Sequence, residues 1–429
     1  MSKRKADDAE MEWETRSDTL ATTRMMDACA SGDYDTVIHL LNDADAADEN
    51  TNTASTATSC GLLAPRHLLA STQVHDTGLS PLMVASRFGH GAICRALLDA
   101  GAPWNALDRA GKCAGDHAVE CENWDIVNLL VDVGTKAELI LGASIRLARG
   151  IDEKSNNNNN TTTTETTTSS STVTSSLGPV SHEPSTKPSY LSHTNVRYDA
   201  SNTLLLDDDD DAIMMEWERP IMEAHASLLT RGGKYGKRIL NIGFGLGIID
   251  TALRSYEPSL HVICEAHPTV HAKMMADGWD TKPNVRICYG RWQDVMPQLI
   301  AEGMKFDGIF YDTYGEHFTD LEDFHAAVIQ VLDTRTSTTD DDDDDDDDDT
   351  AVYSFFNGLA PDNLFFHGVA CQCIKVQLGQ LGLDAEFVQC EISSNAAVTD
   401  EKTWEGVRRP YWHGRSTYYL PIITWKKER

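Results

Sequence analysis

The second half of the chain contains a run of residues whose types and spacing suit ligand binding. Glycine-rich Gly243–Ile248 follows the apolar segment Arg238–Ile242. Glycines let a backbone pass close to a ligand, and the helix expected after them presents unpaired N–H groups. Glu265 lies 22 residues after Gly243, where a carboxylate can accept hydrogen bonds from ribose hydroxyls. This pattern predicts a site for an adenosine-type ligand.

The exact spacing of the glycines narrows the choice of ligand. A dinucleotide-binding fingerprint has glycine at its sixth position, where this chain has Ile248. The Gly-x-Gly-x-Gly form fits an S-adenosylmethionine-binding fold better. Two further motifs flank this run, Ile213-Met-Met-Glu-Trp-Glu-Arg-Pro-Ile-Met222 before it and Tyr311-Asp-Thr-Tyr314 after it.

Together these motifs resemble the guanidino-nitrogen methyltransferases, which include guanidinoacetate methyltransferase and the fungal and plant protein arginine N5-methyltransferases. Ser354–Leu359 and the repeats described below resemble the protein arginine branch. The resemblance covers roughly residues 190–429, and more loosely the N-terminal repeats. It implies a Rossmann-like class I methyltransferase domain that uses S-adenosylmethionine, requires no metal, and monomethylates the δ (N5) nitrogen of arginine in a protein substrate. For that substrate, the family suggests a ribosomal protein.

The resemblance also implies roles for individual residues. Glu218 and Asp312 are expected to bind the guanidinium group, with Asp312 beside the transferring methyl group. Two alternatives remain for Glu218. It could form a surface salt bridge to Arg219 or Arg231, or Glu216 could take the guanidinium-binding role instead. The cofactor pocket is expected to contain Asp312 together with Tyr190, Met214, Met222, Gly243, Phe244, Gly245, Leu246, Gly247, Ile248, Glu265, Ala266, His267, Trp292 and Gln293.

The chemistry of guanidinium agrees with this assignment. Its pKa lies above ~12, so its nitrogens carry no free lone pair at neutral pH. Two carboxylates can hold the cation by charge-assisted hydrogen bonds, fix one nitrogen in line with the methyl group, and draw off proton density.

The elements expected around these residues alternate between strands and helices, which predicts a doubly wound, mainly parallel sheet. The expected strands are Arg238–Ile242, His261–Cys264, Val285–Tyr289, Phe306–Tyr311 and Ala351–Phe356. The expected helices are Ile248–Tyr256, Thr269–Gly278, Trp292–Gly303 and Phe318–Leu332. Glu386–Cys390 and Thr417–Trp425 follow without a helix between them, and predict an antiparallel pair at one edge of the sheet.

The N-terminal region contains an internal repeat. Gly78 and Gly111 are 33 residues apart, as are Gly101 and Gly134. This period, with Ser80-Pro-Leu-Met-Val-Ala85 at the start of one copy, resembles ankyrin repeats, and a more degenerate copy lies upstream. We expect a small all-α ankyrin-like module over residues 20–149 that helps recruit the protein substrate. A generic pair of helical hairpins is the alternative.

Charge and composition limit the classes of partner. Lys plus Arg number 36 and Asp plus Glu number 67, a net charge of −31, which argues against direct nucleic-acid binding. Fifteen of the acids lie in Asp207–Asp211 and Asp340–Asp349, which we expect to be solvated insertions. Residues 150–188 are predicted to be an Asn/Thr/Ser-rich disordered linker, and 189–429 the methyltransferase domain with an acidic loop insertion at 336–350.

The remaining expectations concern setting and alternatives. No apolar run is long enough for a membrane helix, and the cysteines are interpreted as reduced thiols, so we expect the protein in cytoplasm and nucleus. We also expect a monomer. One alternative function is methylation of a small guanidino compound. The other is an ankyrin-type interaction protein whose methyltransferase domain is inactive.

Overall fold

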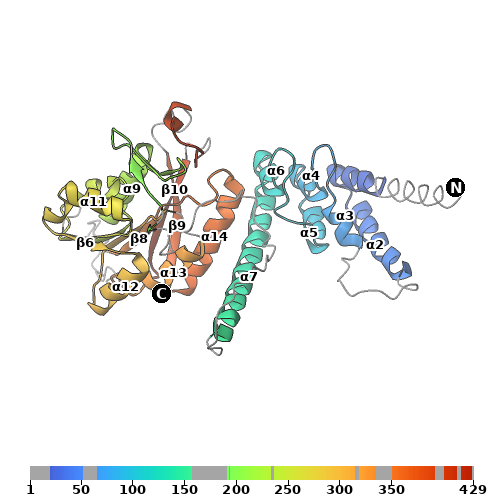
Figure 1. Ribbon diagram of the computed structural model, residues 1–429. Helices are drawn as coiled ribbons and strands as arrows, with labels where there is room; N and C mark the ends of the chain where they lie inside the picture. The colour runs from blue at the N-terminus through green and yellow to red at the C-terminus, as the bar shows by residue number, and fades with distance from the viewer. Residues whose placement is uncertain are drawn as a thin grey trace, which may run out of the picture. The chain divides into compact units, whose positions relative to one another are not determined.

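The chain divides into two compact units in the computed structural model (Figure 1). The first consists of Met1–Asn160 with Asn363–Cys373, and the second of Thr161–Asp362 with Ile374–Arg429. The predicted linker beyond Asn156, Tyr190 and the run Asp340–Asp349 all lie outside the described residues. The structure describes residues 20–51, 65–156, 191–192, 194–232, 236–314, 318–334, 350–391, 401–412 and 417–427.

The described residues of the first unit are mainly helical. Residues 20–31 form a helix, followed by α2 (Tyr34–Thr51), α3 (Pro65–Ser71), α4 (Pro81–Arg87), α5 (Gly91–Asp99), α6 (Ala114–Glu120) and α7 (Trp124–Asn156). Gly78 has a φ of +74°, and a Cβ there would lie 2.8 Å from the backbone nitrogen of Arg109, so the repeat glycine is required at this turn.

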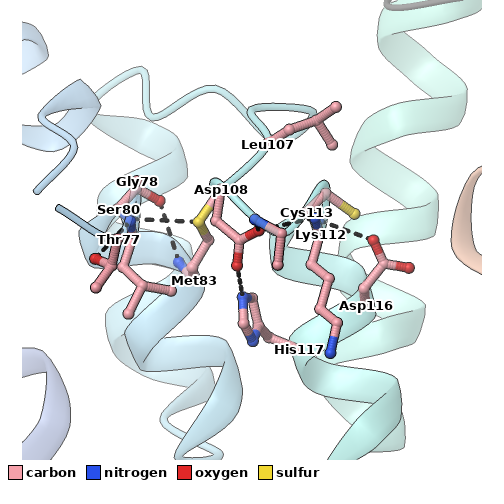
Figure 2. A network of polar contacts seen from close by, with 12 residues as sticks. Thr77, Gly78, Ser80, Met83, Leu107, Asp108, Lys112, Cys113, Asp116 and His117 are labelled. Carbon is pink, nitrogen blue, oxygen red and sulfur yellow. Dashed lines mark hydrogen bonds and ion pairs between the residues drawn. The ribbon is translucent and has the colours of Figure 1, made fainter. Parts of the chain in front are cut away.

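Side-chain caps fix the turns that lead into α4 and α6 (Figure 2). Ser80 accepts a hydrogen bond from the N–H of Met83 at 3.3 Å at the start of α4. Asp108 accepts the N–H of Lys112 at 2.9 Å and contacts the buried His117 at 2.9 Å. Both turns precede the first helix of a pair at the 33-residue period, which favours ankyrin repeats over generic hairpins.

The second unit contains a seven-stranded sheet with the order β6-β5-β4-β7-β8-β10-β9. Neighbouring strands from β6 to β8 pair in parallel, whereas β10 is antiparallel to both β8 and β9. The predicted parallel sheet and its antiparallel edge pair are therefore confirmed. The strands are β4 (Arg238–Ile242), β5 (Leu260–Glu265), β6 (Val285–Tyr289), β7 (Gly308–Tyr311), β8 (Val352–Phe355), β9 (Leu383–Glu391) and β10 (Thr417–Trp425).

Alternate strand residues face two different helical layers. Leu240 and Ile309 pack in one core with α12, α13 and the second half of α14, while Ile239 and Phe310 pack in another with α9, α10 and α11. This two-sided burial explains why the strands are almost continuously apolar. The helices are α9 (Arg219–Leu229), α10 (Ile248–Arg254), α11 (Pro268–Ala276), α12 (Trp292–Ala301), α13 (Phe318–Val328) and α14 (Leu364–Gln380).

A second sheet, which the sequence did not predict, precedes the main one. It consists of β1 (Arg197–Tyr198), β2 (Leu204–Leu206) and β3 (Ala212–Met215), all antiparallel. A short 3-10 helix, η1 (Glu216–Glu218), connects β3 to α9. This sheet places the Met-Met-Glu-Trp-Glu run beside the ends of the parallel strands.

The acidic run Asp207–Asp211 forms the turn between β2 and β3. Asp207 is 1% exposed and Asp211 is 6% exposed, so the expectation of a solvated insertion is wrong for both residues. Each has hydrogen-bond partners that offset its burial, as described below. Within the described residues, no helix has the length and apolar character needed to cross a membrane.

Candidate functional site

A cavity opens at the carboxyl ends of β4, β5 and β7. Eleven of the predicted site residues line it: Met214, Met222, Gly243, Phe244, Gly245, Glu265, Ala266, His267, Trp292, Gln293 and Asp312. Leu246, Gly247 and Ile248 belong to the same glycine loop but are not part of the cavity lining. Tyr190 lies outside the described residues.

The glycine loop approaches its neighbours too closely for any larger side chain. A Cβ at Gly243 would lie 1.8 Å from the backbone oxygen of Asp312, and one at Gly245 would lie 2.5 Å from the sulfur of Met214. Both glycines also have positive φ, +93° and +55°. The loop therefore packs tightly between Asp312, which follows β7, and Met214 of β3.

Buried polar residues of β4, β5 and α10 hold this loop in place. The side-chain amide of Asn241 donates to the carbonyl oxygen of Gly243 at 2.8 Å and to the carboxylate of Asp250 at 2.9 Å. His261 contacts the same carboxylate at 2.9 Å, and all three side chains are fully buried. Because a buried carboxylate is costly without partners, this set fixes the start of α10 relative to β4 and β5.

Glu265 connects the glycine loop to the end of β5. Its carboxylate accepts the N–H of Phe244 at 2.9 Å and the N–H of His267 at 2.6 Å. Burial raises its pKa, and the backbone N–H groups around it oppose that rise. We call the wall formed by Gly243, Phe244 and Gly245 together with Glu265, Ala266 and His267 the adenosine side of the cavity.

The adenosine side fits S-adenosylmethionine. Glycines bring the backbone close to the ligand, Glu265 presents an acceptor at the position expected for ribose, and Trp292 with the apolar Met222 supplies a surface for the adenine ring. Among the described residues, no group of three or more His, Cys, Asp or Glu side chains is arranged to hold a metal ion.

A second group of residues, which we call the guanidino side, consists of Asp312 and Tyr314, which line the cavity, and of Glu218 and Tyr411, which are not among its lining residues. Glu218 lies at the end of η1 and is 3% exposed, and its carboxylate accepts the N–H of Met215 at 2.8 Å and the hydroxyl of Tyr411. Burial and the nearby charge of Asp312 raise the pKa of Glu218 to about 8, although the two hydrogen bonds lower it.

The alternative roles for this position are wrong. Arg219 donates two hydrogen bonds to Glu216, at 2.5 and 3.0 Å. Arg219 is therefore not the partner of the Glu218 carboxylate, and the Glu216 carboxylate is already engaged. Arg231 donates to the backbone oxygen of Thr350. Glu218 is thus the carboxylate of this run that faces Asp312.

Asp312 follows β7, where its N–H bonds the carbonyl oxygen of Ile242 at 2.9 Å. Removal of its carboxyl group from water raises its pKa to about 7. Two carboxyl groups with pKa values near neutrality therefore lie within electrostatic reach of each other, an arrangement that favours binding of a cation and proton transfer.

Aromatic rings surround the guanidino side. Trp217 lies 5.7 Å from Tyr411 and 5.8 Å from Trp412, measured between ring centroids. Tyr418 packs against Trp412, and its hydroxyl contacts a ring nitrogen of His225 at 2.9 Å. Burial lowers the pKa of His225 to about 3, which keeps the imidazole neutral. The rings help to bury Glu218, and the neutral imidazole adds no charge to the guanidino side.

The sequence motifs contained several lining residues that were not assigned. Tyr314 and Thr313 belong to the Tyr311–Tyr314 motif, and Arg291 directly precedes Trp292. Their place next to assigned residues was the available signal. Tyr411 gave no such signal, because 193 residues separate it from its partner Glu218. Apolar lining residues from the second sheet and nearby were also missed, namely Leu191, Val196, Leu205 and Ile213.

Comparisons with known proteins find two matching family models and several relatives. A family model described as guanidinoacetate N-methyltransferase matches residues 184–339, and one described as ankyrin repeats (3 copies) matches residues 25–139. Three relatives are named protein arginine N-methyltransferase 2. The Emericella nidulans protein is 34% identical, covering 76% of each chain, and the Saccharomyces cerevisiae protein is 30% identical, covering 84% of this chain and 82% of its own. The Yarrowia lipolytica protein is 40% identical over 53% of this chain and 45% of its own.

Two solved structures show more distant likeness. The O-methyltransferase TomG from Streptomyces achromogenes, in complex with SAM, is 15% identical and covers 54% of this chain and 92% of its own, with a TM-score of 0.33. Aeropyrum pernix fibrillarin is 13% identical and covers 48% and 76%, with a TM-score of 0.31. Scores this low bear on neither the fold nor the function of this chain.

Proposed function

The chain belongs to the protein arginine N-methyltransferase 2 family, and from that membership and the site geometry we propose that it monomethylates the δ (N5) nitrogen of arginine in a protein substrate. The observation that carries the proposal is the coupled pair Glu218 and Asp312 beside a cavity that fits S-adenosylmethionine. The family model for guanidinoacetate N-methyltransferase supports a guanidino nitrogen as the acceptor.

The two carboxyl groups bind and orient the acceptor. A guanidinium has donors in a planar fork, which matches carboxylate oxygens from Glu218 and Asp312. Approach of the cation favours the ionised form of both groups, so their pKa values fall on binding and the pair releases protons. The charge of the bound substrate is then offset in a site with little water.

The same groups assist the chemical step. When bound, S-adenosylmethionine supplies an electrophilic methyl group on its sulfonium. The acceptor nitrogen must regain electron density for attack, and an ionised carboxylate beside it can take up its proton as the new C–N bond forms. Asp312 lies next to Gly243 of the cofactor loop and is the better placed of the two for this role.

The δ position and the identity of the substrate rest on the resemblance to the protein arginine N5-methyltransferases. We propose a ribosomal protein as the substrate, which is consistent with the net charge of −31, because acidic proteins attract basic partners. We also propose that the enzyme acts as a monomer in the cytoplasm and nucleus. Size-exclusion chromatography with light scattering and imaging of a tagged protein test these two points.

The ankyrin unit is proposed to recruit the protein substrate. Tyr34 and Trp124 occupy equivalent positions at the start of α2 and α7 and are 45% and 57% exposed. A hollow of the unit is lined by Tyr34 together with Asp99 and Asp125. Arg66 and Arg95 also line this hollow and balance its two carboxylates, so the exposed aromatic rings are the feature that suits an Arg-containing segment.

Transfer of a labelled methyl group tests the proposal. The full-length protein is incubated with methyl-labelled S-adenosylmethionine and either ribosomal proteins or free guanidinoacetate, with Glu218→Gln as the matched control. Label in protein that depends on Glu218 supports the proposal. Label in guanidinoacetate alone supports the small-molecule alternative, and no cofactor binding by calorimetry supports the inactive interaction protein.

A further inference from the structure

The acidic turn Asp207–Asp211 is an ordered part of the catalytic unit. The carboxylate of Asp207 accepts the N–H groups of Asp209 at 2.9 Å and Asp211 at 3.0 Å, which closes the turn on itself. Asp210 sits at a φ of +62° between them, a conformation that Asp and Asn tolerate better than most residues. Asp207 and Asp211 consequently point away from solvent, whereas Asp208, Asp209 and Asp210 remain exposed.

The inward carboxylate of Asp207 reaches the guanidino side of the cavity. Its second oxygen accepts the hydroxyl of Tyr314 at 3.0 Å. Tyr314 lines the cavity and lies two residues after Asp312. The bond therefore ties the segment that carries Asp312 to the turn between β2 and β3.

The carboxylate of Asp211 holds a second segment, residues 401–412. It accepts Nε of Arg408 at 2.9 Å and Nη2 of Arg409 at 2.7 Å. The backbone N–H of Arg408 also donates to the carbonyl oxygen of Asp210 at 2.8 Å. These ion pairs raise the pKa of both arginines, and their side chains are 36% and 52% exposed, so the buried partner is Asp211.

The segment held by Asp211 also contains the residue that donates a hydrogen bond to the carboxyl group of Glu218. Tyr411 follows Arg409 by two residues, and its hydroxyl donates to Glu218. Trp412 is 1% exposed and packs against Trp217, which precedes Glu218. One turn thus contacts both segments that deliver groups to the guanidino side.

We propose that Asp207 and Asp211 form an acidic clasp that positions Tyr314 beside Asp312 and Tyr411 on Glu218, so that the guanidino side closes around its substrate. The clasp acts through these tyrosines, and both aspartates are positioning residues. The proposal rests on the proposed guanidino methyl transfer, and it assigns a role to a segment whose composition alone suggested a solvated insertion.

The hydrogen bond from Tyr411 has an electrostatic consequence. It lowers the pKa of Glu218 against the opposing effects of burial and of Asp312. The titratable groups that act on this carboxyl are Asp312, Tyr411 and Tyr418, and the tyrosines stay neutral because burial raises their pKa values. Loss of the clasp should therefore raise the pKa of Glu218 and move the acidic limb of the pH–rate profile to higher pH.

Asp211→Asn tests the clasp in the full-length protein, with Asp210→Asn as the matched control. Both changes remove one negative charge from the same turn, but the Asp210 side chain pairs with the exposed Arg197 instead of the clasp partners. We expect Asp211→Asn to lower kcat/KM for an arginine peptide about tenfold, to shift the acidic limb upward, and to leave the Kd for S-adenosylmethionine within about twofold. A roughly tenfold effect corresponds to one charge-assisted hydrogen bond. Asp210→Asn should change none of the three.

The route through Tyr411 is tested by a double-mutant cycle. Tyr411→Phe should reproduce the shift of the pH profile, and Asp211→Asn combined with Tyr411→Phe should be no worse than Tyr411→Phe alone. Additive effects would show that Asp211 acts elsewhere and would overturn the proposal.

Hydrogen exchange of residues 401–412, measured without substrate, separates the clasp from the proposed function. Faster exchange in Asp211→Asn than in Asp210→Asn supports the clasp even if the wild type methylates no arginine, a result that would overturn only the proposed function. Equal exchange in the two variants overturns the clasp. If Asp211→Asn does not fold, Arg408→Gln, which removes the exposed partner, is measured in the same way with the same two outcomes.

Discussion

The adenosine side and the guanidino side hold their carboxylates by different means. On the adenosine side, Glu265 is surrounded by backbone N–H groups from its own strand end and from the glycine loop. On the guanidino side, Glu218 receives one backbone N–H and one tyrosine hydroxyl, and its pKa rises to about 8. Backbone donors are fixed by the sheet, whereas the guanidino side depends on side chains from segments far apart in the chain.

This difference corresponds to the tasks of the two sides. A carboxylate that accepts ribose hydroxyls can keep one protonation state, so a rigid set of donors suits it. A carboxyl pair that must bind a cation and take up a proton needs a pKa near the working pH. The following variants test that division, beginning with the largest expected effect.

Asp312→Asn should break the guanidino side without affecting the adenosine side. The amide keeps the size of the side chain but loses the negative charge and the base, so we expect turnover to fall by about 10²–10³-fold. The Kd for S-adenosylmethionine, measured by calorimetry, should stay within about threefold. Turnover at the wild-type rate would remove Asp312 from the mechanism.

Glu265→Ala should produce the opposite pattern. Loss of a charged acceptor for ribose, and of the anchor for the N–H of Phe244, should raise the Kd for the cofactor about 10- to 100-fold. Turnover at saturating cofactor should fall much less, because the guanidino side is intact. A large loss of turnover with unchanged affinity would contradict the division into two sides.

The raised pKa values on the guanidino side predict how stability changes with pH. Glu218 and Asp312 titrate near 4.5 and 3.8 when exposed, and at about 8 and about 7 in the folded protein. The folded state therefore binds protons more tightly, and the associated stability is complete below pH ~4 and is lost as pH rises to about 8.

Thermal unfolding of the protein without ligands measures this effect. The midpoint of the wild type, relative to that of the double variant Glu218→Gln with Asp312→Asn, should fall by several degrees between pH ~5 and pH ~8. A difference that is independent of pH would show that the two carboxyl groups are already ionised in the free protein.

The smallest effect is expected in the ankyrin unit. Replacement of Tyr34 and Trp124 by Ala removes exposed rings and should leave the fold intact, because neither side chain is part of the core. We expect KM for a protein substrate to rise about 3- to 10-fold and KM for a short arginine peptide to stay constant. An equal rise for both substrates would contradict recruitment by this unit.

The adenosine side could be predicted from the sequence because it is local. The glycine loop directly follows β4, Glu265 ends the next strand, and parallel strands bring their carboxyl ends to one edge. The same reasoning predicted the alternation of strands and helices from β4 to β8 and the antiparallel edge pair. The 33-residue glycine period likewise indicated the repeats, because each repeat needs a glycine at the same turn and stacks on its neighbours.

The guanidino side could be predicted only in part. Glu218 and Asp312 were assigned by resemblance, but the contacts of Tyr411, Arg408 and Arg409 depend on how residues 401–412 fold back onto the turn between β2 and β3. Nothing in a run of five aspartates indicates which of them will be buried. That choice depends on the turn geometry and on the partners that tertiary structure supplies.

Tandem mass spectrometry of the methylated arginine tests the central claim most directly. The full-length protein is incubated with methyl-labelled S-adenosylmethionine and ribosomal proteins, in parallel with Glu218→Gln, and labelled peptides are fragmented to locate the methyl group. The account predicts a single methyl group on the δ nitrogen of arginine, with the label lost in Glu218→Gln. A methyl group on a terminal guanidino nitrogen or on another residue, or equal labelling by the variant, would contradict it.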